Sequence, residues 1–554
     1  MNERTKTGLE ILQAAVLVGV LGDVLLRVTP WGINVFLFVG ALVAAMTMLF
    51  LRRKQELWSP QTVALNGALV FFAAMFVWRD STELKTADGL AILTILAILT
   101  LPAMKIKTHL AGVFHYGISA AWSGISAAFA PLVLLFGDIE WKTVPQTGWT
   151  KHLIAVLRGM AIAMPILLIF GALFVAADAV FQGIVERTLN IEIDVLVSHV
   201  FLIGVFSWFT AGYLRGSLFG FGSDLTEVKE QVKEEIKPQI LSVTEITDDQ
   251  TPKSEEKPKT EEKSWTWQSF DNSVMPQFFT LGAIETSIVL GLINLLFLSF
   301  VIVQIPYLFG GFDLVQNTPD FKLAEYARRG FGELVAVAAL VLPILLISHW
   351  LLRKDSPVNE KIYRVLAAIQ IVLLFVIMVS AMQRLFILTG NLGYGLTTVR
   401  FYPLAFMIWL AIVFVWFAAT VLRGNRHYFA WGALWSAIFV LGTLHVVNPD
   451  AYIVRTNVRL MNEGRAFDSY YNSNLSDDAI PVLLENLQTM NFQDQCTVKR
   501  NLSWRLTQTK NKNDIRSWSY SRWNARNEMN RFGEGFDLTN CPENTRRQSE
   551  FDDF

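Results

Sequence analysis

The stretch Ser287-Ile-Val-Leu-Gly-Leu-Ile-Asn-Leu-Leu-Phe-Leu-Ser-Phe-Val-Ile-Val-Gln304 contains no charged side chain over 18 consecutive residues. A run of that length can cross about 30 Å of hydrocarbon as a helix. Because a lipid-exposed backbone must satisfy its own hydrogen bonds, helices are the expected spanning elements. Similar apolar segments lie near residues 11–28, 31–51, 61–78, 87–104, 110–137, 153–177, 195–219, 278–305, 332–352, 362–382, 401–422 and 428–447. The sequence therefore predicts an all-α, polytopic transmembrane bundle of 11–12 spans.

The composition agrees with a membrane protein. Hydrophobic residues make up 53% of the 554 residues and charged residues 17%, whereas soluble chains carry about 25% charged residues. The net charge of −1 provides no basic field that would attract nucleic acid. We expect the lipid bilayer as the principal partner, with other membrane proteins as further candidates and the oligomeric state left open.

Basic residues between the segments predict the topology. Arg52-Arg53-Lys54, and Lys105 with Lys107, follow the second and fourth segments and favour a cytoplasmic N-terminus. Arg353-Lys354 also has a cytoplasmic character, which simple alternation of twelve spans contradicts. One early segment must then fail to cross, and 110–137 is our candidate because small and polar residues interrupt it. It is either a re-entrant or interfacial helix or an ordinary span packed through small residues.

The chain divides into four predicted parts. These are a first transmembrane block (1–221), a charged flexible linker (222–277), a second transmembrane block (278–447) and a small, mostly helical C-terminal soluble domain (448–554). Both cysteines, Cys496 and Cys541, lie in the last part. A disulfide in an oxidising compartment is one interpretation, and two free thiols are the other. With 110–137 on one side, the soluble domain is expected outside the cytoplasm.

A polar region follows the opening stretch. Gln304-Ile-Pro-Tyr-Leu-Phe-Gly-Gly311 is expected to end the span, and a charged turn precedes the next one. Glu285 is expected about two turns inside its span, as a proton or ion site or as half of an interhelical pair. On a helix, two carboxylates would bracket Arg329 at i, i+4 positions. The candidate functional cluster is Glu285, Gln304, Tyr307, Glu325, Arg328, Arg329 and Glu333.

Other polar residues in the apolar segments suggest no reaction. Asp23 is expected to pair with Arg27 one turn away. The membrane histidines His199, His349 and His445 lie on different segments, so no metal site is predicted. The sequence contains no glycine-rich phosphate loop, no GxSxG and no HExxH motif. We therefore predict no catalytic residues and no cofactor.

Several ordered motifs resemble a known family. They are Glu285 with Gly291-Leu-Ile-Asn-Leu-Leu-Phe297, Tyr307-Leu-Phe-Gly-Gly311, Glu325-Tyr-Ala-Arg-Arg-Gly-Phe331, Tyr394-Gly-Leu-Thr397 and Asn448-Pro-Asp450. Over residues 150–490, approximately, the chain resembles the bacterial multi-pass membrane family filed as domain of unknown function 4173, with 4153 a close relative. The resemblance implies a bacterial plasma-membrane protein and no established activity. Some members are labelled sensor kinases, but this chain has no nucleotide-binding glycines.

Three functional hypotheses remain open at this point. The first is a non-enzymatic role in sensing, scaffolding or regulation at the cell envelope. The second is a transporter or channel in which Glu285, Arg328 and Arg329 line a polar path. The third is a membrane enzyme for lipid-linked substrates, with Glu325 or Glu333 as acid or base. We favour the first, because no acid–base set or metal set is clustered in the sequence.

Overall fold

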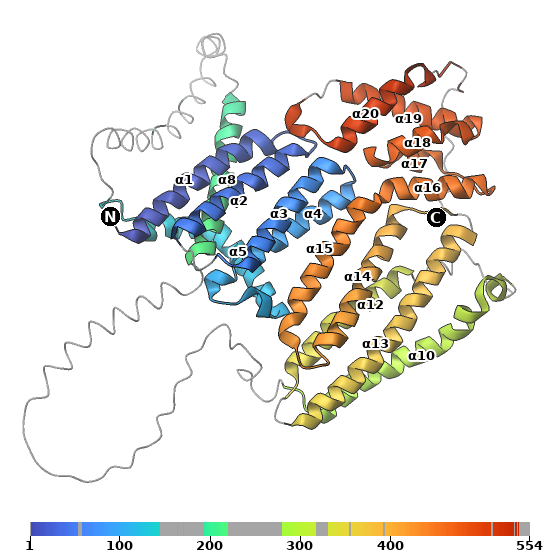
Figure 1. Ribbon diagram of the computed structural model, residues 1–554, viewed down its shortest axis with the longest axis horizontal. Helices are drawn as coiled ribbons and strands as arrows, with labels where there is room; N and C mark the ends of the chain where they lie inside the picture. The colour runs from blue at the N-terminus through green and yellow to red at the C-terminus, as the bar shows by residue number, and fades with distance from the viewer. Residues whose placement is uncertain are drawn as a thin grey trace, which may run out of the picture. The chain divides into compact units, whose positions relative to one another are not determined.

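A computed structural model describes most of the chain (Figure 1). The described residues are 2–53, 58–143, 193–219, 280–316, 331–353, 356–391, 394–510 and 514–536, with the single positions 163, 170, 538, 539 and 541. Regular elements in these ranges are helical, which confirms the all-α prediction. Leu281 and Leu352 add an isolated β-bridge. The predicted linker 222–277 and the apolar segment 153–177 lie outside the described residues, apart from positions 163 and 170.

Eleven helices in the described ranges are long and apolar enough to cross a membrane, which confirms a polytopic bundle. They coincide with eleven of the twelve predicted apolar segments. The helices that contain them are α1 (Glu3–Leu26), α2 (Ile33–Arg53), α3 (Pro60–Trp78), α4 (Thr82–Ile98), α5 (Val113–Val133), α8 (Ile193–Phe219), α10 (Ala283–Gln316), α12 (Phe331–Leu351), α13 (Pro357–Phe386), α14 (Thr398–Thr420) and α15 (Phe429–Val447).

The described chain forms two compact units. The first unit contains the described residues up to Val70, Leu96–Met104 and those from Gly117 to Phe219. In it α1 packs against α2 and α8. Gly19 permits the close approach of α1 to α8, because an added Cβ would lie 2.0 Å from the hydroxyl oxygen of Ser207. Small residues at such crossings let helix backbones meet in a membrane.

Helix α5 ends at the same end of the first unit as α4. The Asp138 carboxylate, which follows α5, contacts Arg4 Nε at 2.7 Å and Arg215 Nε at 2.5 Å. Arg4 begins α1 and Arg215 lies in the last turns of the antiparallel α8. Tyr213, also near the end of α8, donates to the carbonyl of Leu96 at the end of α4. The end of α4 and the residues after α5 therefore both contact the last turns of α8. Helix α5 and its extension to Asp138 are long and apolar enough to cross a membrane, so both interpretations of 110–137 stay open.

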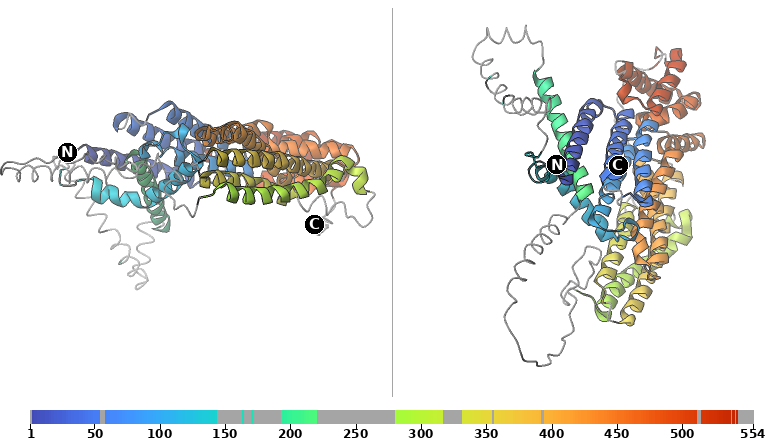
Figure 2. Two further views of the ribbon diagram at one scale, coloured as in Figure 1. Left: turned by 90° about the horizontal axis from the view of Figure 1, so that it is seen from below. Right: turned by 60° about the vertical axis from the view of Figure 1, so that its left-hand side comes forward.

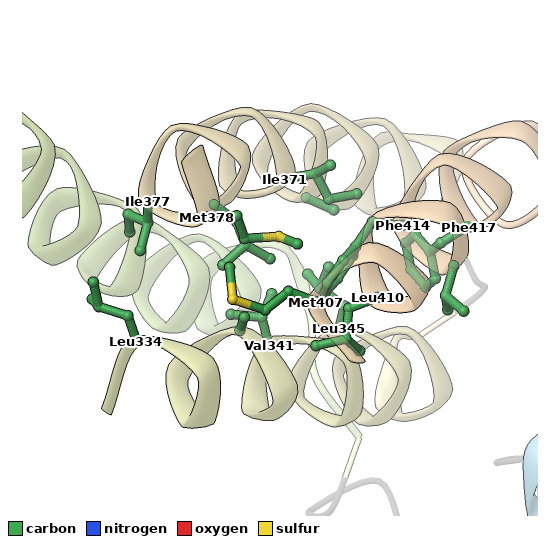
Figure 3. Close-up of a cluster of buried hydrophobic side chains, with 14 of the residues drawn as sticks. Leu334, Val341, Leu345, Ile371, Ile377, Met378, Met407, Leu410, Phe414 and Phe417 are labelled. Atoms are coloured by element: carbon green, nitrogen blue, oxygen red, sulfur yellow. The ribbon is translucent and has the colours of Figure 1, made fainter. Parts of the chain in front are cut away.

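The second unit contains Phe71–Ile95, Lys105–Tyr116 and the described residues from Thr280 onward. Its membrane core lies between α12, α13 and α14, and α10 packs along α13. Figure 3 shows side chains from these helices pointing toward one another. Leu345, Met407 and Phe414 are examples, and each is fully buried. Apolar packing of this density resembles a soluble protein interior, although lipid covers the outer faces.

The C-terminal part of the second unit is a helical domain. It comprises α16 (Pro449–Asn462), α17 (Ser469–Asn474), α18 (Ile480–Glu485), α19 (Phe492–Lys510) and α20 (Tyr520–Phe532), with the short 3₁₀ turn η10 (Asp477–Ala479). Figures 1 and 2 show these helices gathered at one end of the unit's long helices. Their own apolar core includes Val454, Leu483 and Leu502. Cys496 on α19 forms a disulfide with Cys541.

One element departs from its predicted boundary. The span 278–305 was expected to end at the Gln304–Gly311 stretch, but α10 continues through Pro306 to Gln316. At 34 residues, α10 is about 50 Å long, which exceeds the hydrocarbon thickness of about 30 Å. Proline and glycine are tolerated in membrane helices where neighbouring groups satisfy the backbone. The stretch is therefore a helical extension and not a turn.

The disulfide gives a test of the C-terminal domain. Cys496→Ser should destabilise this domain by about 4 kcal/mol, because the bridge closes a loop across a sequence separation of 45. Thermal unfolding of the purified full chain measures the change. The native chain should show no reactive thiol and should shift on a gel when reductant is added. Thiol labelling without reductant would contradict the bridge.

Candidate functional site

The structure describes only part of the predicted polar cluster. Glu325, Arg328 and Arg329 lie outside the described residues. Tyr307 lies on α10, but its side chain is outside the described part. Glu333 lies in the first turn of α12 and is exposed. The proposed bracketing of Arg329 by two carboxylates therefore stays a prediction.

Glu285 is not two turns inside a span, as the sequence suggested. Because α10 begins at Ala283, Glu285 lies in its first turn and is exposed. Its Oε2 accepts a hydrogen bond from the backbone N–H of Gly282 at 3.0 Å. A glutamate at this position that reaches back to the residue before the helix is one half of a capping box. The carboxylate thus satisfies a backbone donor and complements the helix dipole.

Gln304 forms a buried polar contact between α10 and α13. Its Oε1 accepts from Arg384 Nη2 at 2.5 Å and from Ser380 Oγ at 3.1 Å. All three residues are less than one-tenth exposed. A guanidinium in a membrane segment needs acceptors from the protein. Gln304 therefore binds Arg384 inside the bundle. The sequence did not predict this contact.

A larger polar cluster lies where the C-terminal domain meets the α3–α4 turn. Asp478 Oδ2 accepts from the backbone N–H groups of Asp80 at 2.7 Å and Ser81 at 3.1 Å. Its Oδ1 accepts from Arg79 Nη1 at 3.3 Å. Arg79 Nε also donates to the carbonyl of His445 on α15 at 2.8 Å. We call Arg79, Asp80, Ser81 and Asp478 the Asp478 junction.

Further charges surround the Asp478 junction. Asp80 contacts Lys85 Nζ at 2.5 Å and the guanidinium of Arg522 on α20. Arg505 on α19 binds Asp477 at 2.7 Å. The cluster therefore alternates carboxylates with cations. It joins the membrane turn to η10 and α20 of the C-terminal domain.

Two carboxyl groups beside the Asp478 junction have raised pKa values. Burial, together with the negative charges of Glu83 and Asp478, raises the pKa of Asp450 to about 6, although the hydrogen bonds from Ser476 oppose that shift. Asp450 Oδ2 accepts from the backbone N–H of Ser476 at 3.3 Å and from its hydroxyl. Burial also raises the pKa of Asp477 to about 6, although Arg505 opposes that shift. Both groups therefore change charge within about one unit of neutral pH.

Comparison with known proteins identifies a family for this chain. A family model described as Domain of unknown function (DUF4153) matches residues 66–486. The chain belongs to this family. The sequence resemblance had named family 4173 first and 4153 as its relative, so the family prediction holds approximately. The DUF4153 match begins at residue 66, and not near 150. No curated protein and no solved structure matches the chain.

The DUF4153 match contains most of the Asp478 junction's surroundings. Arg79, His445, Asp450 and Asp478 lie inside it. The α19 and α20 cations lie beyond its end at residue 486. The membrane turn and its carboxylate are thus part of the family region, while Arg505 and Arg522 lie outside it.

Sequence reasoning missed the Asp478 junction. Asn448-Pro-Asp450 was noted as a family motif, but it was not linked to the α3–α4 turn. Charged residues beside span ends are common, so the sequence Arg79-Asp80 did not indicate a polar cluster. Among the described residues, no group of three or more His, Cys, Asp or Glu side chains could hold a metal ion. The junction is therefore built on ion pairs and hydrogen bonds.

The Gln304 contact predicts a stability difference between two substitutions. Gln304→Leu should destabilise the protein by about 1–3 kcal/mol, because it removes an acceptor from the buried Arg384 guanidinium. Gln304→Glu keeps an acceptor and adds an opposite charge, so it should retain more stability than the leucine variant. Thermal unfolding in detergent compares them. Equal midpoints for all three proteins would show that the contact has no energetic role.

The raised pKa of Asp450 predicts a pH-dependent stability. Unfolded carboxyls titrate near about 3.9, so between that pH and about 6 the folded state binds more protons at Asp450. This contribution increases stability as pH falls from about 7 to about 4. Asp450→Asn removes the buried charge and should stabilise the protein near neutral pH by up to about 3 kcal/mol, with no gain near pH 4.

Thermal unfolding of the full chain at both pH values measures this effect. Glu463→Gln is the matched control, because Glu463 is exposed just beyond the end of α16. The control should change neither midpoint. A neutral-pH gain for Asp450→Asn that persists unchanged at low pH would exclude titration of Asp450 as the cause.

Proposed function

We propose that the protein is a bacterial plasma-membrane protein with a sensing or regulatory role at the cell envelope. The supporting observation is the Asp478 junction, in which one carboxylate of the C-terminal domain binds three donors of a membrane turn. Directional contacts of this kind transmit a rearrangement of the domain to the spans that they hold. A purely passive anchor requires no buried charges at that position.

The proposed topology places the C-terminal domain outside the cytoplasm. The α3–α4 turn follows three crossings from a cytoplasmic N-terminus, and the domain binds that turn. The two therefore share a side of the membrane. With α5 on the cytoplasmic surface and the predicted segment 153–177 as a crossing, eleven spans bring the chain to the same side. The basic groups after α2, α4 and α12 then all face the cytoplasm.

The environment of the Asp478 junction suggests what the domain responds to. Asp450 and Asp477 both have pKa values raised to about 6 by burial. A fall in external pH neutralises carboxyls that stand beside Arg505 and the Asp478 junction. The balance of charge at the membrane turn then changes without any bound ligand. Acidity and partner binding to the domain are the inputs that this arrangement supports.

Transport is the second candidate function. The observation that favours it is the buried Arg384–Gln304 contact between two spans. The hypothesis that Glu285 lines a polar path has less support, since Glu285 lies at a helix start and accepts a hydrogen bond from the nearby backbone. Solute or ion flux into liposomes that contain the purified protein would separate transport from sensing.

The coupling proposed here is testable with Asp478→Asn. The variant should speed hydrogen exchange at the α3–α4 turn and in α15, because it weakens the acceptor for Arg79. A double-mutant cycle with Arg79→Gln should give a coupling energy of about 0.5–3 kcal/mol.

Asp468→Asn is the matched control for this experiment. Asp468 caps α17 within the same domain through the backbone N–H of Tyr471 at 2.8 Å. It should loosen α17 and leave the membrane turn unchanged. If Asp478→Asn disturbs the C-terminal domain while exchange in the turn and α15 stays at the wild-type rate, the domain is not coupled to the spans.

A further inference from the structure

A buried acid–base pair lies inside the spans, separate from the Asp478 junction. Asp88 on α4 and His445 on α15 are both fully buried. His445 Nε2 lies 2.9 Å from Asp88 Oδ1. Asp88 is about 9 Å along α4 from the first residue of that helix. A carboxylate and an imidazole with no exposure, within hydrogen-bond distance, share their protons as one unit.

Each partner also has a second polar atom that is buried and has no hydrogen-bond partner. These atoms are Asp88 Oδ2 and His445 Nδ1. Buried polar atoms in proteins are normally satisfied, so each exception requires a reason. Here both exceptions fall on the two atoms of the pair where a further proton can be added.

Counting protons shows why the pair should bind one. The Nε2···Oδ1 contact needs a single proton. With that proton alone, the imidazole is neutral, the carboxylate is ionised and the pair carries one net negative charge. A second proton, on His445 Nδ1 or on the free carboxyl oxygen, makes the pair neutral. In a low-dielectric segment the neutral pair avoids an uncompensated charge.

The surrounding charges do not remove the preference of the Asp88–His445 pair for its neutral form with two protons. Lys85, one turn earlier on α4, acts electrostatically on Asp88 but is bonded to Asp80. Arg79 reaches the carbonyl of His445, and its guanidinium also binds Asp478. The turn η3 (Thr108–Leu110), which packs on α15, carries His109 as its titratable residue. The nearby cations are therefore engaged by acceptors closer to the membrane surface.

We propose that Asp88 and His445 form an exchangeable site for one proton within the membrane spans. The proton comes from a hydronium ion: one O–H bond of that ion breaks, one N–H or O–H bond forms on a lone pair of Asp88 or His445, and a water molecule is released. The site goes beyond the sensing role and does not depend on it. It is connected to the Asp478 junction through Arg79, which binds both the His445 carbonyl and Asp478.

Proton uptake by the full chain in lipid nanodiscs tests this proposal. The pH is lowered from about 8 to about 5, the range in which ordinary imidazoles titrate, and bound protons are counted with an indicator dye. Asp88→Asn and His445→Gln should each reduce uptake by about one proton per chain. The double variant should also lose about one proton, since the two residues hold it together.

His109→Gln is the additive control. His109 lies on η3 and is partly exposed, so its loss and that of Asp88 should sum to about two protons. If one variant of the pair does not fold, the other reports the same proton. Unchanged uptake in the pair variants, or a loss of about two protons in their double variant, would overturn the proposal. Failure of the Asp478 coupling with normal proton uptake would contradict only the sensing role.

Discussion

The carboxylate of Asp478 is the contact on which the arrangement of the second unit depends. Asp478 binds the backbone N–H groups of Asp80 and Ser81, which lie immediately before α4. It acts as a capping anion supplied by a distant part of the chain, where the positive end of the helix dipole favours it. Its other carboxylate oxygen, Oδ1, accepts from Arg79. One side chain therefore binds both the backbone before α4 and a guanidinium at the end of α3.

The hydrocarbon thickness made the membrane architecture predictable. An apolar run of about 20 residues has few alternatives to a spanning helix, and eleven predicted segments correspond to observed helices. The predicted helix boundaries were less accurate, because they depend on local interactions and not on the length of the apolar run. Glu285 was placed inside a span because the apolar pattern begins near residue 278, whereas Leu281 forms a β-bridge with Leu352 and α10 begins only at Ala283. Pro306 was taken as a stop, yet α10 continues beyond it.

The polar sites could not be predicted because their partners are distant in sequence. Arg79 and Asp478 are 399 positions apart, and Asp88 and His445 are 357 apart. A single sequence shows that such residues are unusual in an apolar setting, but it does not pair them. His445 was recognised as a membrane histidine and set aside because no second ligand stood nearby in the sequence. Its partner is an aspartate on another helix, and burial gives the pair its chemical interest.

Because the α3–α4 turn and Asp478 are far apart in the sequence, the turn is synthesised well before the carboxylate that binds it. Ribosomes add about 5–20 residues per second, so roughly 20–80 s pass between synthesis of the turn and synthesis of its acceptor. During that interval Arg79 and the start of α4 depend on water and lipid headgroups for hydrogen bonds. The contacts of the α3–α4 turn are therefore complete only after Asp478 has been synthesised. A chain that stops before residue 478 has Arg79 without its carboxylate partner, which distinguishes it physically from the longer chain.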